Sequence, residues 1–265
     1  MEDEKISIYE LLLLHNYFTH KNQTSGSSLG TILAVLGYDP NLKEDDKSKE
    51  LQAKCKELGL SGWVISPYWE VNLSKGETIP YTWYEKLKSN SADAIQEYFT
   101  MNNNHLLIDI IARSYLSIPH RFYMWIYEAK ELFFEKRYIS CAMMLTAILE
   151  GSIRECPVEV WRQQVTKFYD EAVTQKLQNA FDNEYKQLLN KFYEYLVVLS
   201  SLDGYIKSFF DGKKPFDKKV EPDYLERNWL MHGMTHRKIT EIDCIKLFNA
   251  ISTLAFLTEN LNHQK

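Results

Sequence analysis

The apolar stretch between Tyr138 and Glu155 constrains the fold more than any other part of the chain. Its sequence, YISCAMMLTAILEGSIRE, is apolar on nearly every side of a helix until Glu150, and Pro157 stops it. A helix without a polar face has to be surrounded by other elements. We therefore predict that residues 138–155 form the central helix of a helical bundle.

Helical periodicity recurs on both sides of this segment. Apolar residues follow one another at spacings of three and four, which indicates amphipathic helices. They include Phe122, Ile126, Ala129, Phe133, Trp161, Val165, Phe168, Ala172, Leu189, Phe192, Leu196, Leu199, Cys244, Leu247, Phe248, Ile251, Leu254 and Ala255. Helix breakers are scarce, with 10 Gly and 7 Pro in 265 residues. We predict an all-α fold, with a bundle of about five helices over residues 119–265.

A smaller, mainly helical region is expected over residues 1–118. The predicted boundary is Ile118-Pro119, because proline biases its predecessor away from helix and fits the first turn of the next helix. The alternative is one continuous helical domain. Within this region we predict helices over about residues 5–21, 45–58, 82–101 and 105–117.

Two local features of the N-terminal region carry more specific predictions. Gly59 is expected to cap a charged surface helix that ends at about residue 58. The segment 62–73, GWVISPYWEVNL, is rich in β-branched and aromatic residues but contains Pro67. It is expected to be irregular structure packed through Trp63 and Trp69, or a short strand. Stacking of either indole on a nucleic-acid base is the alternative.

Charge and cysteine content limit the classes of function. The formal net charge is −5, so any attraction for RNA has to come from a local basic surface. The four cysteines form no CxxC pair and are expected to be reduced, partly buried thiols. The N-terminus is acidic where a signal peptide is basic, and no apolar run is long enough to cross a bilayer. We expect a cytoplasmic protein without membrane contact.

Start and stop signals define the last two helices. Pro222 fits the first turn of a short helix over residues 222–232, and Gly233 follows as its cap. Thr240 and Asp243 form a capping-box pattern that starts the final helix. A basic loop, DGKKPFDKKVE, precedes the short helix.

The short helix contains the segment ERNWLMHG (226–233), in which Arg227 and Asn228 are followed by three apolar residues and His232. Upstream lies PHRFYMWIYEAKELFFEKRYISCAMMLTAILEGSIRE, with the acidic Glu150 after an apolar run. In this order the pieces resemble the HEPN family, in which an arginine, a polar residue and a later histidine mark the active ribonucleases. The resemblance covers residues 119–262. The preceding region, with GWVISP, is similar to the N-terminal extension of long bacterial HEPN proteins.

The resemblance implies a metal-independent endoribonuclease that works as a homodimer, with a composite site at the two-fold axis. His232 is assigned the acid–base role, because histidine titrates near neutral pH. Arg227 is assigned as the phosphate clamp, because its planar fork meets two phosphate oxygens. Asn228 would position the phosphate or His232. Glu150 would hold Arg227, with an ion pair to Arg154 as the structural alternative.

A weak RNA-binding rim is expected around the motif. It consists of Lys213, Lys214, Lys218, Lys219, Arg237 and Lys238. Interspersed carboxylates make a solvated loop the competing interpretation. Tyr224 and Trp229 would stack on a base or lie buried in the dimer seam.

Other interpretations of the motif remain open. One alternative is that His232 is a helix-end residue stabilised by the helix dipole. His232 and His236 have metal-ligand spacing, but no third ligand is evident, so neither metal nor cofactor is expected. A different class of function is a non-catalytic HEPN module that binds RNA, nucleotide or a protein partner. For the nuclease, the family context implies toxin-like or anti-phage use, with an antitoxin, a trigger or another defence-system protein as partner.

Overall fold

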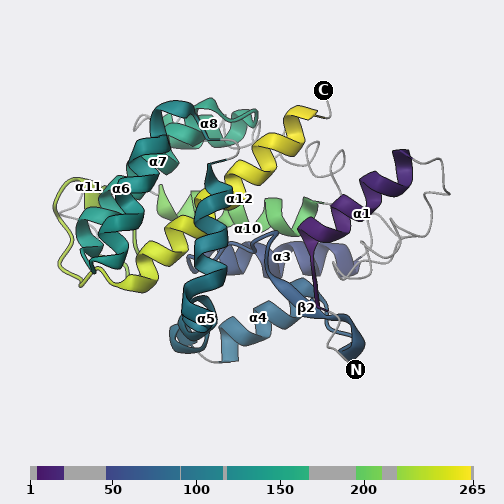
Figure 1. Cartoon of the computed structure of the whole chain (residues 1–265). Helices are drawn as coiled ribbons and strands as arrows, with labels where there is room; N and C mark the ends of the chain where they lie inside the picture. The colour runs from purple at the N-terminus through teal and green to yellow at the C-terminus, as the bar shows by residue number, and fades with distance from the viewer. Residues whose placement is uncertain are drawn as a thin grey trace.

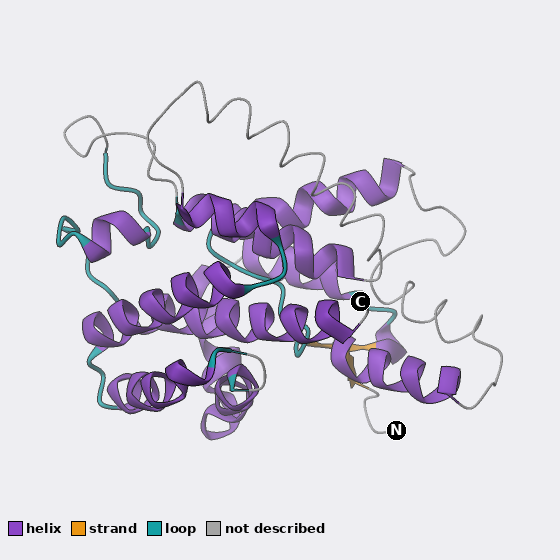
Figure 2. Ribbon diagram, turned by 90° about the horizontal axis from the view of Figure 1, so that it is seen from above, coloured by secondary structure: helices purple, strands orange, loops and turns teal. Residues whose placement is uncertain are grey.

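The computed structural model describes residues 5–20, 46–89, 91–115, 118–166, 195–210 and 220–263. Helices make up most of these residues, and the strands form only one short antiparallel pair (Figure 2). The all-α prediction is therefore confirmed. None of the described helices is both long and apolar enough to cross a membrane.

The described elements come in a fixed order along the chain. They are β1 (Lys5–Ser7), α1 (Ile8–His20), α3 (Asp46–Leu60), β2 (Glu70–Asn72), the 3-10 helix η1 (Leu73–Lys75), α4 (Ile79–Ser89), α5 (Ser91–Ser114), the 3-10 helix η2 (His120–Phe122), α6 (Tyr123–Phe134), α7 (Tyr138–Glu155), α8 (Glu159–Thr166), α10 (Leu196–Phe209), α11 (Arg227–Met231) and α12 (Glu241–His263). Strands β1 and β2 pair with Ile6 opposite Val71.

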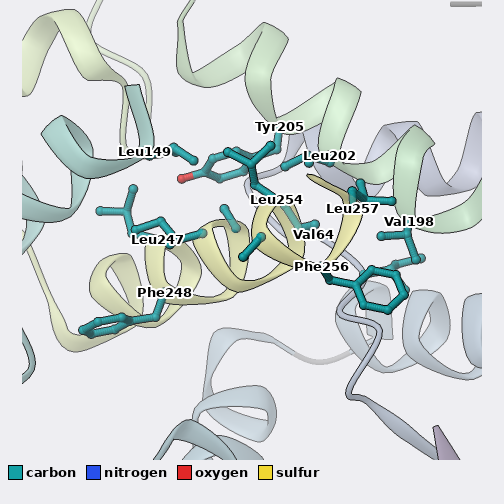
Figure 3. Close-up of a cluster of buried hydrophobic side chains, with 14 of the residues drawn as sticks. Val64, Leu149, Val198, Leu202, Tyr205, Leu247, Phe248, Leu254, Phe256 and Leu257 are labelled. Atoms are coloured by element: carbon teal, nitrogen blue, oxygen red, sulfur yellow. The ribbon is translucent and has the colours of Figure 1, made fainter. Parts of the chain in front are cut away.

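The long helix α12 runs through the middle of the molecule, beside α10, α7 and α5 (Figure 1). Every residue of α10 is buried except Lys207. Figure 3 shows side chains of α12, such as Leu254, within the same cluster as Leu202 and Tyr205 of α10. These two helices, and not the predicted one, form the centre of the bundle.

Helix α7 begins and ends where predicted but does not lie at the centre. One face is buried, whereas Ile139 is 59% exposed and Met143 is 39% exposed. The prediction was wrong because α10 contains polar residues and looked less apolar. Two of them bond within the helix: the hydroxyl groups of Ser201 and Ser208 donate to backbone carbonyls three residues earlier. Such bonds allow a helix with serines to be fully buried.

Helices α3 and α10 pack closely through two glycines. A Cβ atom at Gly59 would lie 2.0 Å from the Ser201 carbonyl oxygen, and one at Gly204 would lie 2.4 Å from the Lys56 carbonyl oxygen. Gly59 therefore lies inside α3 and permits close approach, and its predicted role as a cap was wrong. Gly62, with φ of 92°, follows the end of the helix in the left-handed region. The charged side of the helix lies at the surface as predicted, and its apolar face is buried against α10.

The aromatic segment after α3 behaves as predicted. Residues 63–69 are irregular and buried, and the short strand β2 follows them. Trp63 is 6% exposed and Trp69 is not exposed at all, so both indoles pack in the core and neither is available to a base. The rings of Trp69 and Trp83 have centroids 4.2 Å apart.

The helices after this segment differ from their predicted limits. The predicted helix 82–101 spans the end of α4 and the start of α5, which is one helix up to Ser114. The predicted break at residues 102–104 coincides with two left-handed residues inside α5, Asn103 with φ of 58° and Asn104 with φ of 64°. The first helix was predicted to start at about residue 5. It starts three residues later, at Ile8, because residues 5–7 form β1.

The N-terminal and C-terminal regions share one hydrophobic cluster. Helix α3 packs on α10, and α5 packs on α12. The side-chain amide of Gln96 also donates to Glu241 at 2.5 Å. A separate domain over residues 1–118 stays a prediction. The four cysteines are buried and free, as expected of reduced thiols.

Candidate functional site

Helix α11 carries the arginine–histidine motif and is anchored by two buried side chains. Trp229 and Leu230 are 6% and 3% exposed. The helix begins only after Glu226, which is extended, so the predicted start at residue 222 was wrong. Gly233 ends it in the left-handed region with φ of 67°, as predicted. Because Trp229 is buried within the protomer, it does not stack on a base.

A carboxylate fixes the loop that follows the helix. Glu221 accepts hydrogen bonds from the Thr235 hydroxyl and from the backbone N–H of His236 at 2.7 Å. Burial alone would raise the pKa of Glu221, but these bonds outweigh it and lower the pKa. The segment before the helix is thus held against the loop after it. This contact explains why residues 221–226 stay outside the helix.

Arg227 is held by two neighbours. Its Nε donates to Glu150 Oε2 of α7 at 2.9 Å, and its Nη1 donates to the side-chain oxygen of Asn228 at 2.9 Å. Asn228 in turn donates to Glu226 at 3.1 Å. Asn228 therefore orients Arg227, and its side chain makes no hydrogen bond to His232. Arg227 remains 27% exposed, and its Nη2 has no hydrogen-bond partner among the described residues.

Glu150 binds two arginines at once. Its second oxygen accepts from Arg154 at 2.8 Å, one helical turn further along α7. The two roles considered for Glu150 are therefore not alternatives, since both contacts are present. Burial alone would raise the pKa of Glu150, but the hydrogen bonds from Arg154 and Arg227 outweigh it and lower the pKa. The carboxylate is ionised at neutral pH and can hold Arg227 in place.

His232 occupies the last position before Gly233 and its side chain is exposed. Its backbone N–H donates to the Asn228 carbonyl at 3.1 Å, which closes the helix. Residues five apart on an α-helix point about 140° away from each other around the axis. Since Glu150 turns Arg227 toward α7, a single short helix does not aim both side chains at one phosphate.

Most of the expected basic rim cannot be assigned to the motif. Lys213, Lys214, Lys218 and Lys219 lie outside the described residues. Arg237 is bound to the buried Asp243, at 2.9 Å and 3.2 Å from Nη2 to the two carboxylate oxygens. This ion pair holds Arg237 within the protein, and its assignment to RNA stays a prediction. Lys238 is exposed, and Tyr224 is half-buried.

An exposed apolar stripe lies beside the motif, and sequence reasoning missed it. Ile139 and Met143 project from the side of α7 that also carries Glu150, at spacings of four and seven residues. Tyr127 and Phe134 of α6 are 49% and 42% exposed. The stripe was overlooked because α7 was expected to be buried all round.

Comparison with known proteins does not assign the chain to a family. No family model, no curated protein and no solved structure matches the chain. Among the described residues, no three His, Cys, Asp or Glu side chains lie close enough to hold a metal ion. The HEPN resemblance therefore stays a prediction, and the site rests on its own geometry.

Proposed function

We propose that the chain is a metal-independent endoribonuclease of HEPN type, with an active site formed between two copies. The observation that carries the proposal is the arrangement on α11. Arg227 is oriented by Glu150 and Asn228, its Nη2 has no hydrogen-bond partner among the described residues, and the exposed His232 directly follows the same short helix. A guanidinium held in this way stabilises charge that develops on a phosphate.

The chemistry needs two proton transfers. The ribose 2′-oxygen attacks the adjacent phosphorus, and the bond from phosphorus to the 5′-oxygen breaks. Neutral His232 of one copy takes the proton from the 2′-hydroxyl, and protonated His232 of the second copy gives a proton to the leaving 5′-oxygen. Arg227 contacts the non-bridging oxygens. The products carry a 2′,3′-cyclic phosphate and a 5′-hydroxyl.

The exposed stripe on α7 supports a two-fold contact at this place. Ile139 and Met143 are apolar side chains that would leave water when two copies meet. Because they share the Glu150 side of α7, a contact through them brings two α11 helices toward each other. Met143→Glu is expected to give monomers in mass photometry and to lose cleavage.

The direct test is cleavage of total RNA and of tRNA in excess EDTA, with the product ends mapped. His232→Ala and Arg227→Ala are each expected to lower the rate by about 10²–10⁴-fold. His236→Ala is the matched control, since the hydrogen bond from His236 to Glu221 is made by its backbone, and it should retain the rate. Cleavage that survives both His232→Ala and Arg227→Ala overturns the proposal.

A mixing experiment tests the composite site itself. Wild-type chains are combined with His232→Ala chains and allowed to exchange. If both histidines are needed, the rate falls as the square of the wild-type fraction; a linear fall means that each copy works alone.

A second candidate function is a non-catalytic module that binds RNA, nucleotide or a protein partner. The observation that favours it is that two donors of Arg227 are already used inside the chain. Dimers that bind RNA but leave it intact would establish this function. For the nuclease, a toxin or anti-phage role predicts that expression arrests growth and that His232→Ala relieves the arrest.

A further inference from the structure

A separate cavity lies in the N-terminal region. It has a volume of about 450 Å³ and is lined by β1, the start of α1, the strand β2 and one side of α5. Helix α11 lies at the opposite side of the molecule in Figure 1. This volume is within the range of small-ligand sites. The inference drawn from it does not depend on the ribonuclease.

One wall of the cavity carries an arginine with an unusual environment. The Arg113 guanidinium lies over the rings of Tyr9 and Tyr68, with its carbon 4.3 Å and 4.9 Å from the ring centroids. Asp109 is one turn earlier on α5, yet within the described part of the chain the two form no ion pair and Arg113 makes no hydrogen bond. The two rings lie beside the guanidinium without using its N–H groups as hydrogen-bond acceptors do, so these donors are left for an anion.

The same cavity also presents negative charge. Asp109 and Glu70 are exposed and have no ion pair among the described residues, whereas Glu10 accepts from the hydroxyl and backbone N–H of Ser7. Counted together, three carboxylates face the two cations Lys5 and Arg113. The excess of one negative charge disfavours the binding of a polyanion such as a nucleoside triphosphate or RNA. It favours a ligand that carries one charge of each sign.

The lining of the cavity also includes exposed apolar side chains. Leu13 is 50% exposed and Met101 is 48% exposed, and both line the cavity. A ligand with a large apolar side chain would remove them from water. The remaining polar wall includes His105, which precedes Asp109 by one turn of α5.

We propose that this cavity binds a short zwitterionic peptide. Its carboxylate meets the N–H edge of Arg113, its ammonium group meets Asp109 and Glu70, and its apolar side chain covers Leu13 and Met101. The size fits: Asp109 and Arg113 are four residues apart, or about 6 Å along the helix axis. An extended dipeptide spans about 7 Å.

Titration calorimetry of the full chain with the dipeptide Ala-Leu tests the proposal. N-acetyl-Ala-Leu and Ala-Leu amide, in which one charge is removed, are each expected to bind at least tenfold more weakly. Adenosine monophosphate serves as the anionic comparison and is expected not to compete. Absence of binding by Ala-Leu and related apolar dipeptides, or tighter binding of the nucleotide, overturns the proposal.

Variants then assign the two charges. Arg113→Gln should weaken Ala-Leu at least tenfold, while Arg137→Gln, at an arginine 61% exposed in the turn between α6 and α7, should leave it unchanged. Circular dichroism checks that Arg113→Gln is folded. Asp109 is exposed, and Asp109→Asn tests the proposed contact with the ammonium group. It should weaken Ala-Leu but not N-acetyl-Ala-Leu, and an equal effect on both peptides contradicts the assignment.

Discussion

Arg227 and Arg237 lie ten residues apart and both bind a carboxylate, but their surroundings differ. The partner of Arg237, Asp243, is 3% exposed, and both of its oxygens contact the same guanidinium nitrogen. The partner of Arg227, Glu150, is 16% exposed and is shared with Arg154. Arg237 therefore stabilises the start of α12, whereas Arg227 is held by a carboxylate of α7.

The difference shows how to separate a structural arginine from a candidate site arginine. Asp243 also accepts from the backbone N–H of Thr240 at 2.8 Å, so that one carboxylate caps α12 and binds Arg237. Removing it breaks two interactions inside the protein. Removing Glu150 affects mainly where one side chain points. The predictions below test this contrast from the largest expected effect to the smallest.

The largest effect is expected for Asp243→Ala. It leaves Arg237 without its buried partner and α12 without its cap, and should lower the free energy of unfolding by about 3–5 kcal/mol. Urea unfolding followed by circular dichroism measures the change. Asp46→Ala is the control, because Asp46 also lies in the first turn of a helix but is fully exposed. A loss under about 1 kcal/mol for Asp243→Ala would remove the contrast.

The paired substitutions Arg227→Lys and Arg237→Lys sharpen the comparison. Lysine keeps the charge but loses the planar fork. Arg227→Lys should lower RNA cleavage about 10–100-fold, which corresponds to about 1.4–2.7 kcal/mol in the transition state. Arg237→Lys should instead lower the free energy of unfolding by about 1–2 kcal/mol with cleavage unchanged. The opposite assignment of the two effects would show that the structural role belongs to Arg227.

Features that depend on residues close together in the sequence were predicted better than features that depend on contacts between distant residues. The limits of α7, the left-handed Gly233 and the contact between Thr240 and Asp243 were all predicted, and each depends on residues close together in sequence. Pro157 and the apolar run decide where α7 ends. A capping box is defined by a spacing of three residues.

The global parts depend on contacts between distant residues. Nothing near Gly59 indicates that it faces Ser201 of α10, so a helix cap was the natural prediction. Arg237 was assigned to the basic rim because it follows the motif in the sequence, and its bond to Asp243 was not predicted. For Glu150, the spacing to Arg154 was visible, but the bond to Arg227 joins residues 77 positions apart. The composite site itself stays a prediction.

Glu150→Gln tests how the carboxylate holds Arg227. At neutral pH it should lower the free energy of unfolding by about 1 kcal/mol and cleavage by about tenfold. The pKa of Glu150 is lowered from its ordinary value of 4.5, so as pH falls the unfolded chain takes up this proton first. The stabilisation is therefore present above about pH 4.5 and is lost as pH falls through the lower folded pKa.

The difference between wild type and Glu150→Gln should thus shrink below pH 4.5. Urea titrations at a series of pH values measure it. A difference that stays constant down to pH 3 would show that Glu150 contributes through packing and not through its charge.

The smallest effect is expected for Arg154→Ala. Arg154 binds the other oxygen of Glu150, but its side chain is 45% exposed and the pair spans one turn of α7. Pairs of this kind contribute about 0.3–0.5 kcal/mol. Because Arg227 still holds Glu150, cleavage should fall less than about twofold. If Arg154→Ala instead reduced cleavage as strongly as Arg227→Lys, both arginines would belong to the site, and the exposed side of α7 would have to carry the phosphate.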